Sequence, residues 1–345
     1  MKTITKGKNM NNLKKVGLTA LAGSLAAISA HAAEMTVSGA TLLTYTSEDG
    51  SEVTGNPLGM KTNLGFKASG EVNGYTVSYM QTSADQFAGM SSARLSVDMG
   101  DIGTIAFDQG SGSGLGTIDD KTPTAAEEIW DGIDAGTAGA GGLVGAAGSK
   151  GVVNYINTMS GVTLNAAFRK GSGTKNSDGA SSGAGQSAWD FALTTDGSQL
   201  GVEGLAIGAG YGVAQNGDNA LANNSQSSSE DVHMTAFANY SIGAVTVGAQ
   251  ISDIDKNSAA AVSQEAEAWG IAYNINENLS VSYGEREVEY KNASAAHVTE
   301  KGSGIAVAYT MGSIKIAGNQ NDVKDNDGTK ASDDKMTEIA VSFAF

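Results

Sequence analysis

Apolar and polar residues alternate with a period of two along most of the chain beyond residue 33. Tyr75, Val77 and Tyr79, for example, alternate with Thr76 and Ser78. Successive side chains of a β-strand point to opposite faces, so this pattern predicts strands with one apolar and one polar face. Sixteen such strands are predicted, at residues 35–46, 58–70, 75–82, 91–99, 104–108, 151–157, 162–169, 187–196, 204–214, 232–241, 245–253, 265–273, 279–290, 303–310, 314–319 and 336–345.

The connections between these strands alternate in length. Seven short turns are interleaved with longer polar loops, which lie at residues 47–57, 83–90, 109–150, 170–186, 215–231, 254–264, 291–302 and 320–335. This alternation is typical of an antiparallel meander with its turns on one side and its loops on the other. An even number of strands brings both ends of such a meander to the same side.

An all-β, up-and-down barrel satisfies this arrangement, because closure pairs every backbone group and leaves no edge strand. The direction in which the apolar face points decides whether such a barrel is soluble or lies in a membrane. A ring of about sixteen strands is too wide for side chains to fill, so its lumen holds water and its apolar face must point outward into lipid. The sequence therefore predicts a transmembrane antiparallel β-barrel, and the mean hydropathy of -0.15 is consistent with strands that are half polar.

The first 32 residues predict export. They contain five Lys and no acid, then an apolar run over residues 16–30, then Ala30-His31-Ala32. These are the three parts of a secretory signal peptide, and the run is short for a membrane anchor. We therefore expect a signal peptide at 1–32 and a barrel domain at 33–345, exported through the periplasm to the outer membrane of a Gram-negative cell.

Composition excludes several other classes. The absence of Cys excludes disulfides, thiolate metal sites and a Cys nucleophile. The net charge is -16, and removal of the five leader Lys leaves 16 bases against 37 acids, or -21, which argues against a nucleic-acid partner. No GxSxG or HExxH motif sits on a suitable element, and His233 and His297 have no partner at motif spacing, so we expect surface histidines and no enzyme.

Three short motifs carry a resemblance to a known family. They are Lys14-Lys15-Val16-Gly17-Leu18, then Val37-Ser38-Gly39, and finally Val341-Ser342-Phe343-Ala344-Phe345. Together with the leader and the strand pattern, they resemble the general trimeric porins of Gram-negative bacteria over residues 10–345. The resemblance implies a homotrimer of water-filled pores and a third loop folded into each lumen. It also implies an outer-membrane insertion signal at Phe343 and Phe345, read by the barrel-assembly machinery through the C-terminal strand.

Residues 109–150 are the candidate for that third loop. They form the longest connection, and a loop of that size needs a functional reason. Its acidic residues are the candidate pore constriction: Asp119, Asp120, Glu127, Glu128, Asp131 and Asp134. The alternative is a solvated external loop whose acids only keep it soluble.

The facing wall is expected to carry bases. Six bases fall on polar faces by parity, namely Lys61, Lys67, Arg94, Arg169, Arg286 and Lys315. The candidate basic wall consists of Lys61, Lys67, Arg94 and Arg169, and the first three are favoured because the early strands lie beside the third loop. A need to face water explains Arg286 and Lys315 at least as well. Acids on the loop and bases on the wall would produce a transverse field across the constriction.

No cofactor is predicted, with one candidate exception. Asp119, Asp120, Glu127 and Glu128 could hold a structural Ca²⁺, because hard cations bind clustered oxygens.

The predicted function is passive diffusion of small hydrophilic solutes and ions, with a preference for cations. The expected partners are two further copies of the chain, outer-membrane lipid and lipopolysaccharide, and the permeating solutes. A non-channel outer-membrane barrel, an adhesin or a substrate-specific barrel that displays binding loops, is the alternative. A secreted soluble β-protein is a third interpretation, favoured by the 47 Gly.

Overall fold

The computed structural model describes residues 34–50, 54–83, 89–133, 141–148, 150–171, 187–216, 229–257, 262–292 and 296–345. The predicted signal peptide lies outside these residues, as does Asp134 of the candidate constriction. Within the described part of the chain, no helix has the length and apolar character needed to cross a membrane.

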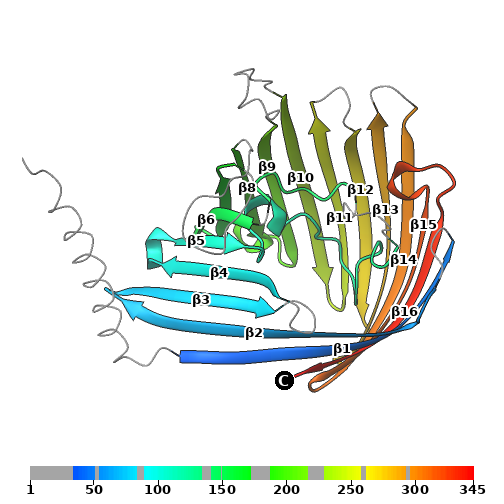
Figure 1. Ribbon diagram of the computed structural model, residues 1–345, viewed down its shortest axis with the longest axis horizontal. Helices are drawn as coiled ribbons and strands as arrows, with labels where there is room; N and C mark the ends of the chain where they lie inside the picture. The colour runs from blue at the N-terminus through cyan, green and yellow to red at the C-terminus, as the bar shows by residue number, and fades with distance from the viewer. Residues whose placement is uncertain are drawn as a thin grey trace, which may run out of the picture.

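Sixteen antiparallel strands form one closed barrel, which confirms the predicted fold class (Figure 1). The first eight strands are β1 (Glu34–Gly50), β2 (Leu58–Val72), β3 (Tyr75–Ser83), β4 (Met90–Asp98), β5 (Thr104–Gln109), β6 (Lys150–Met159), β7 (Val162–Arg169) and β8 (Ala188–Asp196). The other eight are β9 (Leu205–Asn216), β10 (Ser229–Ile242), β11 (Val245–Lys256), β12 (Val262–Asn274), β13 (Leu279–Asn292), β14 (Val298–Met311), β15 (Ile314–Lys324) and β16 (Asp334–Ala344). Each strand pairs with its neighbours in sequence, and β1 pairs with β16 to close the ring.

Several strands are longer than predicted, mainly at their loop ends. The predicted strand 314–319 extends to Lys324, and the predicted strand 303–310 begins at Val298. Alternation fails there because polar residues occur on both faces, whereas backbone pairing continues: Lys301 pairs with Lys324. The barrel wall therefore extends beyond the segments in which apolar and polar residues alternate.

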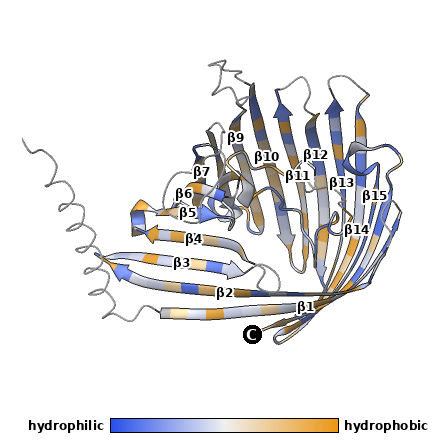
Figure 2. Ribbon diagram, in the orientation of Figure 1, coloured by the Kyte–Doolittle hydropathy of each residue, from blue (hydrophilic) through white to orange (hydrophobic). Residues whose placement is uncertain are grey.

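Hydrophobic and hydrophilic residues alternate along the strands (Figure 2), and the two faces of the wall have opposite character. On β11, Ile251 is 60% exposed and points outward, whereas its neighbour Gln250 is 5% exposed and points inward. Seven aromatic residues of the strands point outward with 39–50% exposure, namely Tyr45, Tyr79, Trp189, Tyr240, Trp269, Tyr283 and Tyr309, whereas Tyr155 is half-buried. This is the arrangement that a barrel with a lipid-facing outer surface requires.

The closing seam includes the C-terminal residues. Gly39 donates its backbone N–H to the carbonyl of Phe345 at 2.8 Å and accepts from the N–H of Phe345 at 2.9 Å. The side chains of Phe343 and Phe345 are 40% and 68% exposed. Both rings lie exposed on the barrel surface, and the insertion signal stays a prediction.

Four short 3₁₀ turns complete the described structure: η2 (Gly100–Ile102), η3 (Gly114–Thr117), η4 (Gly197–Leu200) and η6 (Asn326–Gly328). Two of them lie near the long third connection. The turn η3 is part of it, and η6 contacts it through Asn326, whose side-chain amide donates to the carbonyl of Ile133 at 2.6 Å.

Candidate functional site

The described residues of the 109–150 connection, called the inner loop below, pack against the inward face of the barrel (Figure 1). Their partners are inward-facing side chains on strands from β4 to β16. The inward side chains of the wall are buried where the loop covers them. Inward side chains are buried on many strands from β5 to β16, whereas on β1 to β3 only Ser83 is buried among the described residues. The uncovered part of the inner wall therefore lies along β1 to β3.

Two buried carboxylates hold the ends of the inner loop. Asp108, with no exposed surface, accepts hydrogen bonds from the Ser111 N–H at 2.9 Å and the Ser113 hydroxyl at 2.7 Å. Asp190 on β8 accepts from the N–H of Leu115 at 3.0 Å and the N–H of Ala147 at 2.7 Å. Asp190 therefore ties the outgoing and returning limbs of the loop to one strand.

Side-chain amides on the wall satisfy the backbone of the loop. Gln250 donates to the carbonyls of Ile118 at 2.8 Å and Asp119 at 3.0 Å, and it accepts from the N–H of Lys121 at 2.6 Å. Asn239 donates to the carbonyl of Lys121 at 2.7 Å. A buried backbone group without a partner costs about 1–3 kcal/mol, so these amides stabilise the loop at this position.

Apolar contacts hold the loop as well. Leu115, Ile118 and Val144 of the loop form a buried cluster with Phe237 and Ile254 of the wall. Farther along, Ile133 packs with Val323 and Met336. These wall residues occupy inward positions, where the sequence pattern predicts polar side chains. The loop rather than lipid covers them.

A row of glycines on the inward face of the wall makes room for the loop backbone. Gly248, Gly270, Gly284 and Gly304 are cross-strand partners in sequence on β11 to β14. A β-carbon at Gly270 would lie 2.7 Å from the carbonyl oxygen of Pro123. At Gly284 and Gly304 it would lie 3.2 Å and 3.0 Å from the Ile129 side chain. The absence of side chains lets the loop backbone approach the sheet closely.

An asparagine stands at each end of this glycine row. Asn239 pairs with Gly248, and Asn321 pairs with Gly304. Asn321 donates to the carbonyls of Glu128 at 3.1 Å and Asp131 at 2.9 Å. The row of four glycines and two asparagines, called the glycine track below, thus combines close approach in its middle with hydrogen bonds at both ends.

Arg286 anchors the loop at Trp130. Its guanidinium lies 4.6 Å from the centroid of the Trp130 ring and 3.5 Å from Glu300, and both charged side chains are buried. Glu300 also accepts from the Tyr290 hydroxyl at 3.1 Å and from the N–H of Asp327 at 2.9 Å. The sequence interpretation that Arg286 only faces water is wrong, because the loop covers it.

The acids of the loop fall into two groups. Asp119 and Asp120 lie beside Arg286 and Trp130 around a cavity of about 20 Å³ between loop and wall. Burial raises the pKa of Asp119 to about 6, with Asp120 adding to the effect, and burial also raises the pKa of Asp120.

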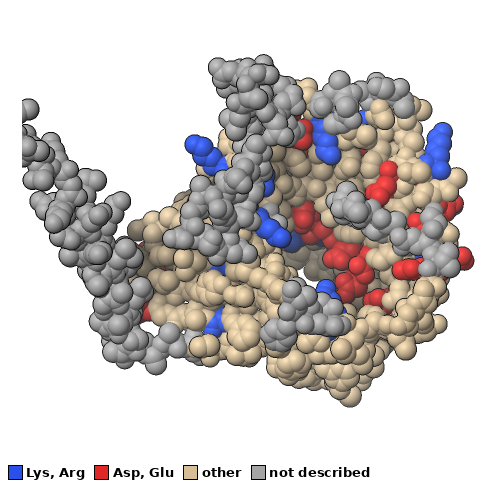
Figure 3. Space-filling model, in the orientation of Figure 1, with Lys and Arg blue, Asp and Glu red and all other residues tan. Residues whose placement is uncertain are grey.

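Glu127, Glu128 and Asp131 form the second group. Burial, together with the carboxylates of Glu127, Glu338 and Glu128, raises the pKa of Asp131 to about 6, against the lowering effect of Lys61. The favoured base Lys61 therefore interacts with an acid of the loop. Figure 3 shows acidic side chains gathered in the hollow of the barrel, with a few basic ones around them.

The other predicted wall bases have different surroundings. Arg94 donates to the carbonyl of Gly112 at 3.0 Å and to the side chain of Asn154, so it supports the start of the loop. Arg169 lies beside Gly148 at the end of the loop and interacts with Asp190. Lys67 is exposed on the inward face of β2.

Two smaller expectations can be compared with the structure. His233 is half-buried and accepts from the N–H of Gly145 at 3.3 Å, so the surface interpretation is wrong for it, whereas His297 is exposed and contacts Glu289 at 3.0 Å. Within the described residues, no group of three or more His, Asp or Glu is arranged to hold a metal ion. The Ca²⁺ site at Asp119, Asp120, Glu127 and Glu128 stays a prediction without a ligand cluster to support it.

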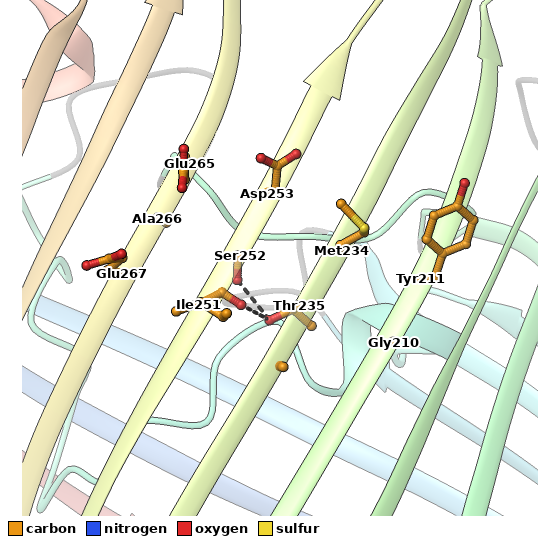
Figure 4. A pocket seen from close by; sticks show the side chains of 11 residues that line it. Gly210, Tyr211, Met234, Thr235, Ile251, Ser252, Asp253, Glu265, Ala266 and Glu267 are labelled. Carbon is orange, nitrogen blue, oxygen red and sulfur yellow. Dashed lines mark hydrogen bonds between the residues drawn. The ribbon is translucent and has the colours of Figure 1, made fainter.

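A second cavity lies away from the inner loop (Figure 4). It measures about 370 Å³ and opens on the outward face of β9 to β12, between Tyr211, Met234 and Ile251. Asp253, Glu265 and Glu267 line its loop-side rim, and Ala236 leaves its floor shallow. As the cavity is outside the ring of strands, it does not contribute to the passage through the barrel.

A sequence profile of the family described as Gram-negative porin matches residues 17–345. No curated protein sequence matches the chain significantly.

Solved structures with the same fold include a loop-deletion mutant of OmpT, an outer membrane protein of Vibrio cholerae. It is 13% identical, with a TM-score of 0.65 over 91% of this chain and 100% of that chain. The trimer form of Vibrio cholerae OmpT is 12% identical, with a TM-score of 0.62 over 91% and 100% of the two chains. The anion-selective porin from Comamonas acidovorans is 12% identical, with a TM-score of 0.65 over 91% and 100%.

Proposed function

The chain belongs to the Gram-negative porin family and resides in the outer membrane, and from this premise we propose that it forms a water-filled channel for passive diffusion of small hydrophilic solutes with a preference for cations. The main support is the position of the inner loop. It packs over the inward faces of β4 to β16 and leaves β1 to β3 uncovered, so solutes pass between the loop and these three strands.

The charges along this passage support the cation preference. Glu127, Glu128 and Asp131 lie on the loop side, and Lys61 lies on the wall of β2. Like charges lining a narrow aqueous passage raise the local concentration of the opposite ion. The fold alone does not decide the sign, because the porin from Comamonas acidovorans shares the fold and is described as anion-selective.

We also propose that three copies assemble. This proposal is supported by Vibrio cholerae OmpT, which shares the fold and has been solved in a trimer form. Outward-facing apolar residues at the seam of β1 and β16, such as Val37, Leu43 and Ile339, are exposed in the single chain and are compatible with either a neighbouring copy or lipid.

Reconstitution in planar lipid bilayers tests the channel. The purified protein should give stepwise conductance, and its reversal potential under a KCl gradient should have the sign of a cation-preferring pore. Absence of conductance steps would reject the channel and favour a non-channel barrel that displays binding loops.

Removal of the loop acids tests the origin of the preference. A variant with four neutral amides should shift the reversal potential toward zero; the substitutions are Asp119→Asn, Asp120→Asn, Glu127→Gln and Glu128→Gln. The matched control neutralises four outward acids on β12 and β13, namely Glu265, Glu267, Glu285 and Glu287. The control has the same net charge, so an equal shift in both variants would assign the preference to total charge and not to the loop.

A further inference from the structure

The acidic side of the passage continues from the inner loop onto the barrel wall. On β16, Ile339 is 52% exposed and points outward, so its neighbour Glu338 points inward. The Thr46 hydroxyl on β1 donates to Glu338 Oε2 at 2.9 Å. Thr46 and Glu338 are also cross-strand partners, which fixes this carboxylate at the seam between the first and last strands.

The contacts of the loop bring Asp131 to the same place. Asn321 on β15 donates to the carbonyl of Asp131. Ile133 packs against Met336, and a β-carbon at Gly132 would lie 2.6 Å from the Met336 side chain. Met336 precedes Glu338 by two residues on the same face of β16, a separation of about 7 Å along a strand. The loop segment that contains Asp131 is therefore held beside Glu338.

The strands next to Glu338 are those that the loop leaves uncovered. β1 follows β16 in the ring, and β2 follows β1. Glu338 is half-buried, and Lys61 on the inward face of β2 is exposed. Both Glu338 and Lys61 interact electrostatically with Asp131. A solute that passes between the loop and β1 thus meets Glu338 as well as the acids of the loop.

We propose that Glu338 is a selectivity-determining residue of the passage, a wall carboxylate that acts with Asp131 to favour cations and to disfavour anionic solutes. This inference rests on the proposed channel function and extends its acidic side from the loop to the barrel wall. Glu338 does not bind a metal ion in this role. It contributes a fixed negative charge whose orientation the Thr46 hydroxyl maintains.

Substitution of Glu338 by Gln tests the proposal in the full-length protein. The amide keeps an oxygen that accepts from Thr46 but removes the charge. The ratio of cation to anion permeability in KCl should fall by about fourfold, because Coulomb's law gives about a twofold effect on each ion, in opposite directions, for one charge about 10 Å from the ion path in water. Glu267→Gln, on the outward face, removes the same charge and should leave the ratio unchanged.

A second measurement separates a role in the passage from a structural role. Asp131 is surrounded by Glu127, Glu128 and Glu338 on the acidic side and by Lys61 on the basic side. Glu338 raises the pKa of Asp131, so Glu338→Gln should move the midpoint of the pH dependence of selectivity to lower pH. A substitution that only loosened the barrel would also hydrate Asp131 and lower its pKa, so the control is Glu338→Asp, which shortens the side chain but keeps the charge and should leave the midpoint close to that of wild type.

The outcomes distinguish this inference from the channel itself. Wild-type protein that fails to conduct would overturn the channel and this inference with it. Wild-type protein that is cation-preferring, with an unchanged permeability ratio and pH midpoint in Glu338→Gln, would overturn the role of Glu338 alone. If Glu338→Gln does not refold, Glu338→Asp and Glu338→Lys replace it. We expect the preference to decrease in the order wild type, Asp, Lys, and equal preferences would overturn the proposal.

Discussion

The glycine track makes the position of the inner loop sensitive to a single methyl group. In Gly270→Ala, the added β-carbon would lie 2.7 Å from the Pro123 carbonyl oxygen, whereas ordinary contacts begin near 3.4 Å. Because the obstacle is backbone, the loop must move by about 0.7 Å away from the wall. Overpacking of this kind costs about 1–3 kcal/mol.

The displacement should be visible in single-channel recordings. The loop moves toward the uncovered strands β1 to β3, so the mean conductance should decrease and the open-channel noise should increase. The temperature of barrel unfolding, followed by the loss of the β-sheet signal in circular dichroism, should change little, because strand pairing does not depend on the loop.

Gly302→Ala is the matched control. Gly302 lies on the same inward wall, and its added β-carbon would meet only the Arg286 carbonyl oxygen, at 3.8 Å. Both substitutions restrict the unfolded chain equally, so that contribution cancels between them. Wild-type conductance and noise in both variants would refute the claim that the glycine track sets the position of the inner loop.

Two further predictions concern the loop. Gln250→Leu removes three hydrogen bonds to the loop backbone and should weaken the attachment of the loop by about 3 kcal/mol, detected as increased protease cleavage within the loop. The control Gln320→Leu, at an outward-facing position, should be cleaved at the wild-type rate. Cleavage of Gln250→Leu at the wild-type rate would contradict the role of its amide. Cation preference should fall as the pH is lowered through about 6, because Asp119 and Asp131 have pKa values raised to about 6 and become neutral below it. Reversal potentials recorded from pH 8 to pH 5 measure this change, and a flat profile would contradict it.

The fold was predictable because each strand carries its own signal. Alternation depends only on neighbouring residues, so it located all sixteen strands, and it stopped short where polar residues occur on both faces near the end of a strand, as at 320–324. The order and antiparallel pairing of the strands then followed from the alternation of short and long connections.

The wall positions that the inner loop contacts were not predictable in the same way. Gly248, Gly270, Gly284 and Gly304 have no regular spacing, and they form a row only through the register of four strands. A glycine at an inward position of a strand is nevertheless a signal of close backbone approach. Applied to every strand, this rule would have identified the positions, although not the loop residues that contact them.

The surroundings of the charged residues were also not predictable from the strand pattern. Sequence parity placed Arg286 on the inward face correctly, but parity does not show what covers that face. Trp130 is 156 positions earlier in the chain, and only the path of the loop brings its ring over Arg286. Glu338 was missed for a related reason, since the acids of the loop were sought within one segment.

The seam between β1 and β16 has a consequence for how the barrel is made. Every other strand pairing joins neighbours in sequence, whereas Thr46 and Glu338, which meet at the seam, are 292 positions apart. Local hairpins form quickly, but a pairing of such high contact order must wait until the intervening strands are in place. Until then the sheet has two open edges, each able to template pairing with another chain. The period before closure is therefore when aggregation competes with folding, and substitutions at this one seam should affect folding yield more than equivalent substitutions at any hairpin.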